Sequence, residues 1–152
     1  ARTLVHGLKY RDRLDLAQWM ARWMLRAGSD LVADAAVVVP IPLHRRRLWW
    51  RRFNQSAQLA RVVAEAAGKP FAPSALSRVR PTAQQGGLSA SERDRNVRGA
   101  FRSERGFAGR AVAVVDDVMT TGATLDELAG TLPAAGAQRV VNWVLARTPP
   151  PA

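Results

Sequence analysis

Short apolar runs that alternate with segments of helical periodicity constrain the fold of this chain more than any other feature of its sequence. Three runs rich in valine share this character: residues 35–41, 110–115 and 139–146. Such runs are typical of strands buried on both faces of a parallel sheet. Apolar side chains recur at helical spacing in the segments between and before them, over residues 12–27, 54–67 and 124–132. This order predicts an α/β domain with a largely parallel sheet.

The apolar positions predict which face of each helix is buried. In the first helix the stripe is Leu16, Trp19, Met20, Trp23, Met24 and Ala27, and Gly28 is expected to end the helix in a left-handed cap. In the second, Asn54 is the expected N-cap and Gly68 the expected end, with Leu59, Val62, Val63 and Ala66 inward. In the third the inward residues are Leu125, Leu128, Ala129 and Leu132.

A long polar segment, residues 76–101, interrupts this pattern. Arg, Ser, Gln and Gly dominate it, and only Ser89 and Glu92 suggest local order, as the capping box of a short helix. Long polar segments inside a compact domain are functional lids or are disordered. We expect one domain over residues 1–147, with this segment as a small hood, and a Pro-rich tail over residues 148–152.

The amino-acid composition limits the kinds of site and partner that this chain can have. The chain of 152 residues has no cysteine, which excludes disulfides, thiol catalysis and cysteine zinc sites, so no zinc is expected. Its net charge is +11, and nearly all the basic residues are Arg, a side chain that forms bidentate contacts with phosphate. An anionic partner, nucleic acid or a phosphorylated metabolite, is the natural inference. No apolar window is long enough for a membrane span and no signal peptide is visible, so we expect a cytoplasmic location.

The stretch AVVDDVMTTGAT, residues 113–124, carries the clearest chemistry. Strand, turn and helix follow one another there, and ligands bind beyond the carboxyl ends of strands in open α/β sheets. The expected phosphate cup consists of Thr120, Thr121, Gly122, Ala123 and Thr124, because hydroxyl groups, free amides and a helix N-terminus favour an anion. Asp116 and Asp117 accept hydrogen bonds and suit a diol, so ribose 5-phosphate meets both demands. Both carboxylates reach one sugar only if the strand ends before them. The alternative interpretation is an acidic strand end beside a Thr-capped helix.

VVDDVMTTGAT resembles the phosphoribosyl-pyrophosphate (PRPP) motif of type I phosphoribosyltransferases. VPIPLHRRRLWWRRFNQSAQLAR, SRVRPTAQQGGLSASERDRNVRGAF and AGAQRVVNWVLAR are similar to the ComF/GntX branch of that superfamily, and the resemblance covers nearly the whole chain. It implies a parallel sheet flanked by helices, with a smaller hood. It also implies that Asp116 and Asp117 contact the ribose hydroxyls and that residues 120–124 hold the 5-phosphate.

The resemblance extends to other parts of the site. It implies a pyrophosphate loop formed by Leu43, His44, Arg45, Arg46 and Arg47. Mg²⁺ would arrive with the diphosphate, without dedicated protein ligands. In the hood, Gln84, Gln85, Arg93 and Asn96 are candidates to face the ligand, whereas Glu92 and Asp94 are candidate bases by position only. No catalytic residue is identified. Members of the branch usually carry an N-terminal four-cysteine zinc ribbon, whose ligands are absent from this cysteine-free chain.

The segment HRRRLWWRR, residues 44–52, combines arginine with tryptophan, as single-stranded nucleic acid prefers. Its candidate contact residues are Arg46, Arg47, Trp49, Trp50, Arg51 and Arg52. Two other interpretations stay open: the arginines serve only the diphosphate, and the tryptophans are buried or contact a protein.

Two functions from different classes therefore follow. One is an enzyme that binds Mg–PRPP, or a nucleotide containing ribose 5-phosphate, and transfers the phosphoribosyl group to a nitrogen acceptor with release of pyrophosphate. The other is a non-catalytic competence protein that binds single-stranded DNA or a DNA-processing partner during DNA uptake. The acceptor base and the oligomeric state do not follow from the sequence.

Overall fold

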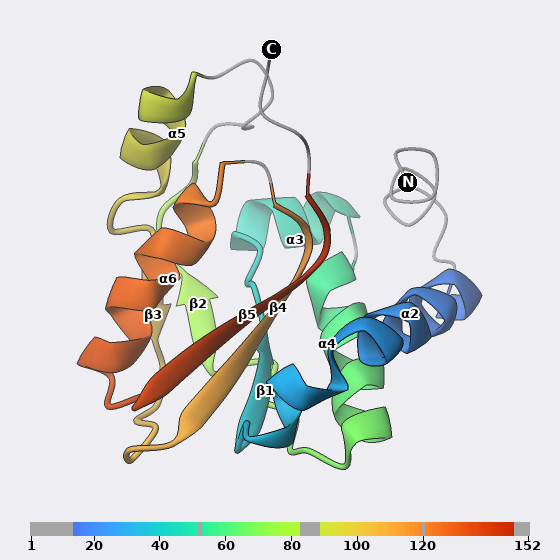
Figure 1. The fold of residues 1–152 in the computed structure, drawn as a ribbon. Helices are drawn as coiled ribbons and strands as arrows, with labels where there is room; N and C mark the ends of the chain where they lie inside the picture. Colours follow the sequence, from blue (N-terminus) through green and yellow to red (C-terminus); the bar gives the residue numbers. More distant parts are fainter. Residues whose placement is uncertain (1–13, 52, 83–88, 120, 148–152) are drawn as a thin grey trace.

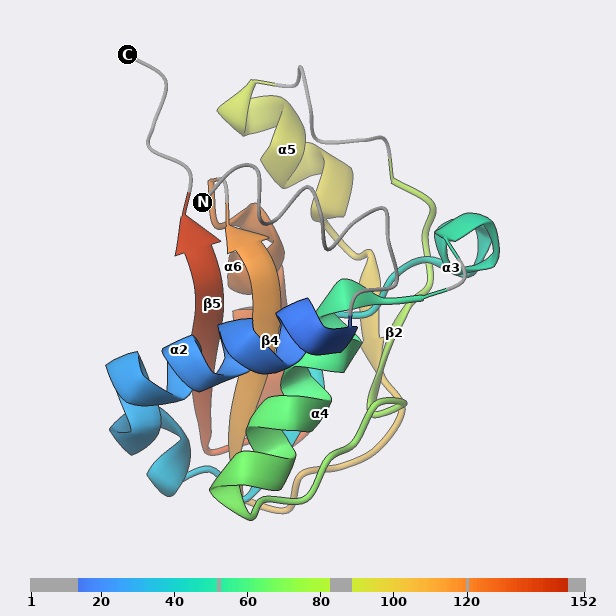
Figure 2. The same cartoon turned by 90° about the vertical axis from the view of Figure 1, so that its right-hand side faces the viewer.

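Helices and strands alternate along the chain around one parallel sheet (Figures 1 and 2). The computed structural model describes residues 14–51, 53–82, 89–119 and 121–147. Its elements are α2 (Leu14–Ala33), β1 (Val37–Pro40), α3 (Arg45–Arg51), α4 (Gln55–Ala67), β2 (Leu76–Arg78), α5 (Ala90–Val97), β3 (Phe101–Ser103), β4 (Ala111–Met119), α6 (Ala123–Ala134) and β5 (Arg139–Arg147). The predicted α/β class, a parallel sheet flanked by helices, is confirmed.

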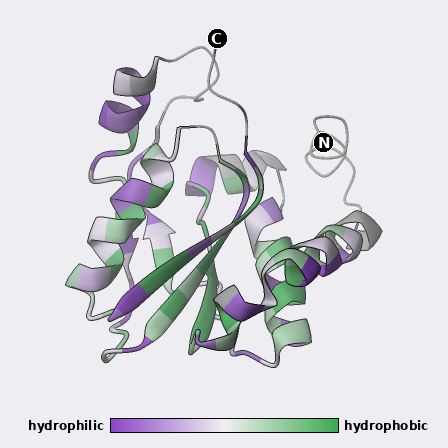
Figure 3. Ribbon diagram, in the orientation of Figure 1, coloured by the Kyte–Doolittle hydropathy of each residue, from purple (hydrophilic) through white to green (hydrophobic). Residues whose placement is uncertain are grey.

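The sheet has the strand order β1-β4-β5, with both pairs parallel. Alternate residues of β4 serve two separate cores, as the period of two along a strand requires. Val112 and Val114 pack with α6 and the β2–β3 pair, whereas Ala113 and Val115 pack with α2 and α4. Figure 3 shows mostly hydrophobic residues along the strands of this sheet, whereas the helices beside it carry both hydrophilic and hydrophobic residues. All four residues of β1 are buried, which accounts for its continuous apolar run.

The second predicted helix is confirmed at both ends. The Asn54 side chain accepts a hydrogen bond from the Ala57 N–H, and Gly68 adopts the left-handed conformation at φ 63°. Its inward face is shifted relative to the prediction. Leu59, Ala60, Val63 and Ala64 are buried, whereas Val62 is half-buried and Ala66 is exposed. In α6, Leu125, Leu128 and Leu132 are buried as predicted, and Ala129 is exposed.

The first predicted helix differs in length. The helix does not end at Gly28; it is kinked there, and α2 continues to Ala33. Gly28 has φ −163° and ψ 38°, so it is extended in φ and forms no left-handed cap. The kinked extension places Val32 and Ala35 in the core beside β1.

The prediction that Trp19 and Trp23 belong to the core is wrong. Their side chains are 50% and 60% exposed, whereas Met20 and Met24 are 2% and 4% exposed. The inward face of α2 is completed by Ala17 and Ala21, small side chains that let α2 lie close to α4. Trp19 and Trp23 each precede a methionine by one residue, which turns them about 100° toward solvent in a 3.6-residue helix. Their rings lie 5.6 Å apart between centroids.

The hood contains two strands that the sequence did not predict. β2 and β3 form an antiparallel pair, and α5 lies between them in the chain. The Ser89–Glu92 capping box at the start of α5 is confirmed. The Gly99 N–H donates to Glu127 Oε1 at 2.7 Å, which ties the end of the hood to α6. Residues 83–88 lie outside the described part of the chain.

Among the residues that the structure describes, no strand pairs with the outer edge of β5. The outer edge of β1, by contrast, is covered by the segment after α4, since Val38 exchanges backbone hydrogen bonds with Pro70 and Ala72. No helix in the described ranges is both long and apolar enough to cross a membrane.

Candidate functional site

The paired carboxylates lie within β4, not beyond its end. The sequence predicts a strand that stops at Val115, but β4 runs on through Asp116 and Asp117 to Met119. Pairing with β5 extends it, since Asp116 lies opposite Val144 and Val118 opposite Ala146. The backbone is nevertheless irregular here. The Asp117 N–H donates to Asp116 Oδ1 and the Val118 N–H donates to Asp117 Oδ1, each at 2.9 Å.

The two carboxyl groups are close neighbours despite this continuation. Burial, and secondly the charge of Asp117, raise the pKa of Asp116 to about 7. A hydrogen bond opposes this rise, because the Ser56 hydroxyl donates to Asp116 Oδ1 at 3.0 Å. Near neutral pH Asp116 is therefore present in both its protonated and its ionised form. A pair of this kind can accept hydrogen bonds from a diol when it is ionised.

The expected phosphate cup lies where α6 begins. Gly122 is the N-cap of α6 and has φ 96°, a conformation that glycine adopts without steric cost. It has no side chain with which to cap the first turn of α6. Thr121 Oγ1 accepts from the Ala123 N–H at 3.4 Å. Thr120 lies outside the described residues.

A small hollow joins the carboxylate to this turn. Its lining consists of Asp116, Val118, Met119, Gly122, Ala123, Thr124 and Leu125. Its volume is about 20 Å³, so it has room for one water or one phosphate oxygen, and the rest of a ligand would lie over it. The structure thus brings Asp116 together with three members of the predicted cup: Gly122, Ala123 and Thr124.

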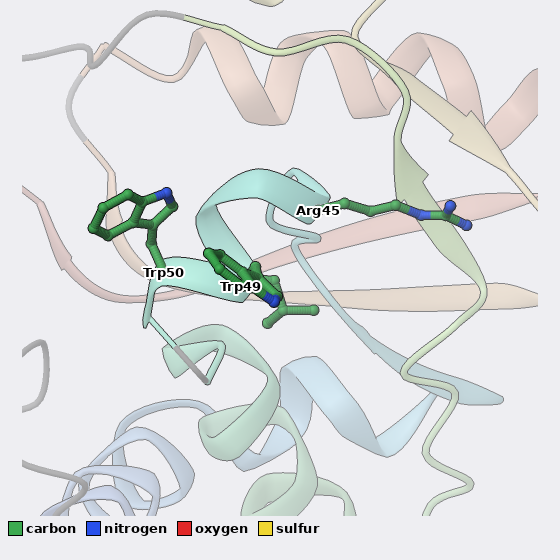
Figure 4. A pocket seen from close by; sticks show the side chains of 4 residues that line it. Arg45, Trp49 and Trp50 are labelled. Carbon is green, nitrogen blue, oxygen red and sulfur yellow. The ribbon is translucent and has the colours of Figure 1, made fainter.

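The predicted pyrophosphate loop is a loop only in part. Residues 45–47 form the first turn of α3, and the Arg46 N–H donates to His44 Nδ1 at 3.3 Å. That contact gives the helix a side-chain acceptor at its start. The Arg45 side chain extends toward β2 (Figure 4). Hydrogen bonds from Ser77 and Arg102, and then the charges of Arg102 and Arg45, lower the pKa of Glu104, the residue that follows β3. Leu43 and His44 remain as the loop after β1.

α3 carries an exposed aromatic surface. Trp49 and Trp50 are 80% and 82% exposed, which excludes the interpretation that they are core residues. Their rings lie 6.4 Å apart between centroids and nearly perpendicular, at 85°. With Arg45 and Leu48 they line an open hollow of about 680 Å³ (Figure 4). Arg46 is also exposed. Arg47 and Arg51 belong to the same helix, and Arg52 lies outside the described residues.

The hood residues are placed in part. Gln84 and Gln85 lie outside the described residues, whereas Arg93 and Asn96 are half-buried on α5. Arg80 donates to the Asn96 carbonyl oxygen at 3.2 Å, which ties α5 to the segment after β2. The Glu92 carboxylate is occupied by the N-cap: the hydroxyl and the N–H of Ser89 both donate to it, and these contacts lower the pKa of Glu92. A lowered pKa makes Glu92 a weak general base.

The first turn of α4 holds three site residues that the sequence analysis missed. Asn54 was expected only as a cap, yet its Nδ2 donates to the Ile41 carbonyl oxygen at 2.9 Å. Gln55 and Ser56 are 3% and 5% exposed. Gln55 Nε2 has no hydrogen-bond partner among the described residues. One feature of the sequence could have revealed these residues: three polar residues stand in a row at the start of an amphipathic helix, although a helix N-cap requires only one polar side chain.

Comparison with known proteins identifies relatives along nearly the whole chain. DNA utilization protein YhgH of Salmonella typhi is 40% identical over 152 aligned residues, and the match covers 95% of this chain and 66% of the relative. Competence protein F of Haemophilus influenzae is 32% identical over the same shares. The chain thus spans just under two thirds of the length of these relatives. No known protein-family profile matches it.

Solved structures agree on the fold. Glutamine PRPP amidotransferase from B. subtilis, complexed with ADP and GMP, superimposes with a TM-score of 0.60 at 24% identity, over 93% of this chain and 30% of that chain. An allosteric regulatory enzyme of purine biosynthesis gives 0.62 at 22% identity over the same shares. The chain therefore belongs to the family of DNA utilization protein YhgH and competence protein F, and it shares its fold with glutamine PRPP amidotransferase.

Proposed function

We propose that the site at the end of β4 binds PRPP, or a nucleotide that contains ribose 5-phosphate, together with Mg²⁺. The observation that carries the proposal is the hollow that joins Asp116 to Gly122, Ala123 and Thr124. A sugar phosphate has a diol and a phosphate a few ångströms apart, and this hollow sets a carboxylate beside the N-terminus of α6. Amides and the helix dipole favour the phosphate, and the carboxylate accepts from the hydroxyls.

Mg²⁺ fits this donor set as a companion of the ligand. Among the described residues no three carboxylate, histidine or cysteine side chains gather into a ligand group. Mg²⁺ binds oxygen and keeps several waters, so the diphosphate oxygens of PRPP would supply its main ligands. Bound Mg²⁺ would supply charge neutralisation for the diphosphate. Asp116, which lines the hollow, would hold and orient the ribose, whereas Asp117 lies within the same strand and is not among the lining residues.

Transfer of the phosphoribosyl group is the activity that such binding would serve. The bond between C1 of the ribose and the diphosphate oxygen breaks, a nitrogen acceptor bonds to C1 with inversion, and pyrophosphate leaves. The residues contribute position and electrostatic stabilisation. The hood would exclude water from the reacting carbon. Release of pyrophosphate from PRPP, assayed across a panel of nitrogen bases, tests this activity directly.

Ligand binding is tested by thermal unfolding with Mg–PRPP. A ligand at about 100 times its Kd stabilises a protein by about 2.7 kcal/mol, an easily measured rise in Tm. We expect this rise in the wild-type protein and its loss in Asp116→Asn/Asp117→Asn. Asp34→Asn is the matched control, because Asp34 is exposed and pairs with Arg139 away from the site. The absence of any rise at millimolar PRPP removes the proposal.

A second candidate function is contact with single-stranded DNA through α3. The observation that favours it is the pair Trp49 and Trp50, which are 80% and 82% exposed beside Arg45 and Arg46. Indole faces stack on unpaired bases, at about 1–3 kcal/mol per base, while guanidinium groups contact phosphates. The names of the relatives, DNA utilization protein and competence protein, accord with a role in handling DNA. A DNA-processing protein is the other partner this surface would serve.

Binding of a fluorescent oligothymidine tests this candidate. We expect affinity that falls steeply with salt, and a loss of about tenfold or more in Trp49→Ala/Trp50→Ala. Trp23→Ala is the matched control, an exposed tryptophan on a different helix. An unchanged affinity in the double variant removes the stacking contact. Binding that is weak and independent of salt removes DNA as the partner and leaves a protein.

A further inference from the structure

The first turn of α4 connects two parts of the site that are far apart in the chain. Asn54 uses both ends of its side-chain amide: Oδ1 accepts from the Ala57 N–H, and Nδ2 donates to the Ile41 carbonyl oxygen. The first contact caps α4 and the second fixes the loop that follows β1. Any shift of this loop relative to α4 therefore breaks one of the two contacts.

Ser56 connects α4 to β4, as Asn54 connects it to the loop after β1. Its hydroxyl donates to Asp116 Oδ1 at 3.0 Å, across 60 positions of sequence. Ser56 is 5% exposed, so bulk water does not compete for this contact. A buried hydroxyl that donates to a carboxylate is worth more than one at the surface, because the charge-assisted bond is stronger and local screening is weak.

The contact also limits how the carboxylate can turn. Asp116 Oδ1 accepts from the Ser56 hydroxyl and from the Asp117 N–H. These two donors occupy Oδ1 and leave Oδ2 for the Asp117 carboxyl group or for a hydroxyl of a ligand. Without the Ser56 hydroxyl, one of the two restraints on this side chain is lost, and only the Asp117 N–H still opposes the rise in pKa that burial causes.

We propose that Ser56 is a positioning residue of the phosphoribosyl site, which orients the Asp116 carboxylate toward the ribose hydroxyls while Asn54 holds the loop after β1 in the same frame. The inference deepens the proposed function and rests on it. Ser56 does not contact the ligand; it acts through Asp116. Recognition of the sugar should therefore depend on Ser56, and recognition of a bare phosphate should not.

The experiment compares two probes on the same variants. Affinities for Mg–PRPP and for inorganic phosphate are measured by calorimetry for the wild type, Ser56→Ala and Ser56→Thr. We expect Ser56→Ala to bind PRPP about tenfold more weakly, the effect of losing about one hydrogen bond to a charged group. Its affinity for phosphate should be unchanged. Ser56→Thr keeps the hydroxyl and should retain most of the PRPP affinity. Ser103→Ala is the control, since that hydroxyl donates to the Arg105 carbonyl oxygen away from the site.

A second readout needs no ligand. Carbon-13 NMR of the Asp116 carboxyl group, assigned by its loss in Asp116→Asn, should show a higher pKa in Ser56→Ala than in the wild type, because the hydroxyl favours the charged form. If Ser56→Ala fails to fold, Ser56→Cys keeps the volume of the side chain and replaces the hydroxyl by a weak donor.

The outcomes separate the two claims. A wild type that binds PRPP, with Ser56→Ala equal to it in affinity and in the Asp116 titration, overturns this inference and leaves the proposed function standing. Equal losses for PRPP and for phosphate also overturn it, because they indicate general disruption of the site. A wild type that binds no PRPP overturns the proposed function and this inference with it.

Discussion

Asp116→Asn should stabilise the protein, and by an amount that depends on pH. Burial and the neighbouring Asp117 raise the pKa of Asp116 from 3.8 to about 7. The folded state therefore holds a proton that the unfolded state has already released, and folding loses stability as the pH rises from about 4 to about 7. Each pKa unit is worth about 1.4 kcal/mol, so the loss above pH 7 is at most on the order of 4 kcal/mol. Asparagine has nearly the same shape, carries no charge, and still offers the Ser56 hydroxyl an acceptor.

Urea unfolding at pH 5 and at pH 8 measures this difference. The free energy of unfolding of Asp116→Asn should exceed that of the wild type by about 2–3 kcal/mol more at pH 8 than at pH 5, since most of the titration lies between these values. Asp117→Asn is the control: it removes the smaller cause of the raised pKa and leaves burial, the larger one, so its gain should be smaller. An advantage of Asp116→Asn that is the same at both pH values would refute the assignment of a near-neutral pKa to Asp116.

Three further tests, two of which compare a pair of substitutions, probe packing and backbone geometry. Gln55→Met should raise the free energy of unfolding by about 1 kcal/mol, because a buried donor without a partner costs about 1–3 kcal/mol and methionine is a flexible apolar replacement; a lower urea midpoint contradicts this. Gly122→Ala should cost about 1–2 kcal/mol in thermal unfolding, because φ is 96° there, whereas Gly130→Ala, inside the same helix, should cost nothing. Met24→Ala should lower the free energy of unfolding by about 2–5 kcal/mol, because Met24 is buried, and Trp23→Ala should change it by no more than about 1 kcal/mol. Equal losses for the two variants in urea unfolding would mean that Trp23 is a core residue after all.

The sequence predicts the elements that local chemistry decides. Asn54 and Gly68 bound α4 as expected, because a side-chain cap and a left-handed glycine need only their own neighbours. The Ser89–Glu92 capping box is correct for the same reason. The alternation of valine runs with amphipathic segments is enough for the parallel sheet, since buried strands and helices have different periods.

The errors arise where distant segments decide the outcome. β4 extends beyond Val115 because β5 lies beside it and offers partners as far as Arg147, a residue the local pattern of β4 cannot reveal. Trp19 and Trp23 share helical spacing with Met20 and Met24, and periodicity alone cannot say which of two adjacent stripes faces α4. The contact of Ser56 with Asp116 joins residues 60 positions apart, so no sequence window contains both.

The open outer edge of β5 has a consequence for the behaviour of the protein in solution. Among the described residues nothing pairs with the outer edge of this nine-residue strand, and its outward N–H and C=O groups are a template for a strand from another copy. Sheet proteins avoid such pairing with charge at the edge. Arg139 and Arg147 stand exposed at the two ends of β5, and exposed Asn142 lies between them. Every copy carries the same positive charge, so repulsion keeps copies apart, and salt screens that repulsion over about 10 Å at 0.1 M. The protein should therefore associate more, not less, as ionic strength rises, which light scattering across a salt series would record.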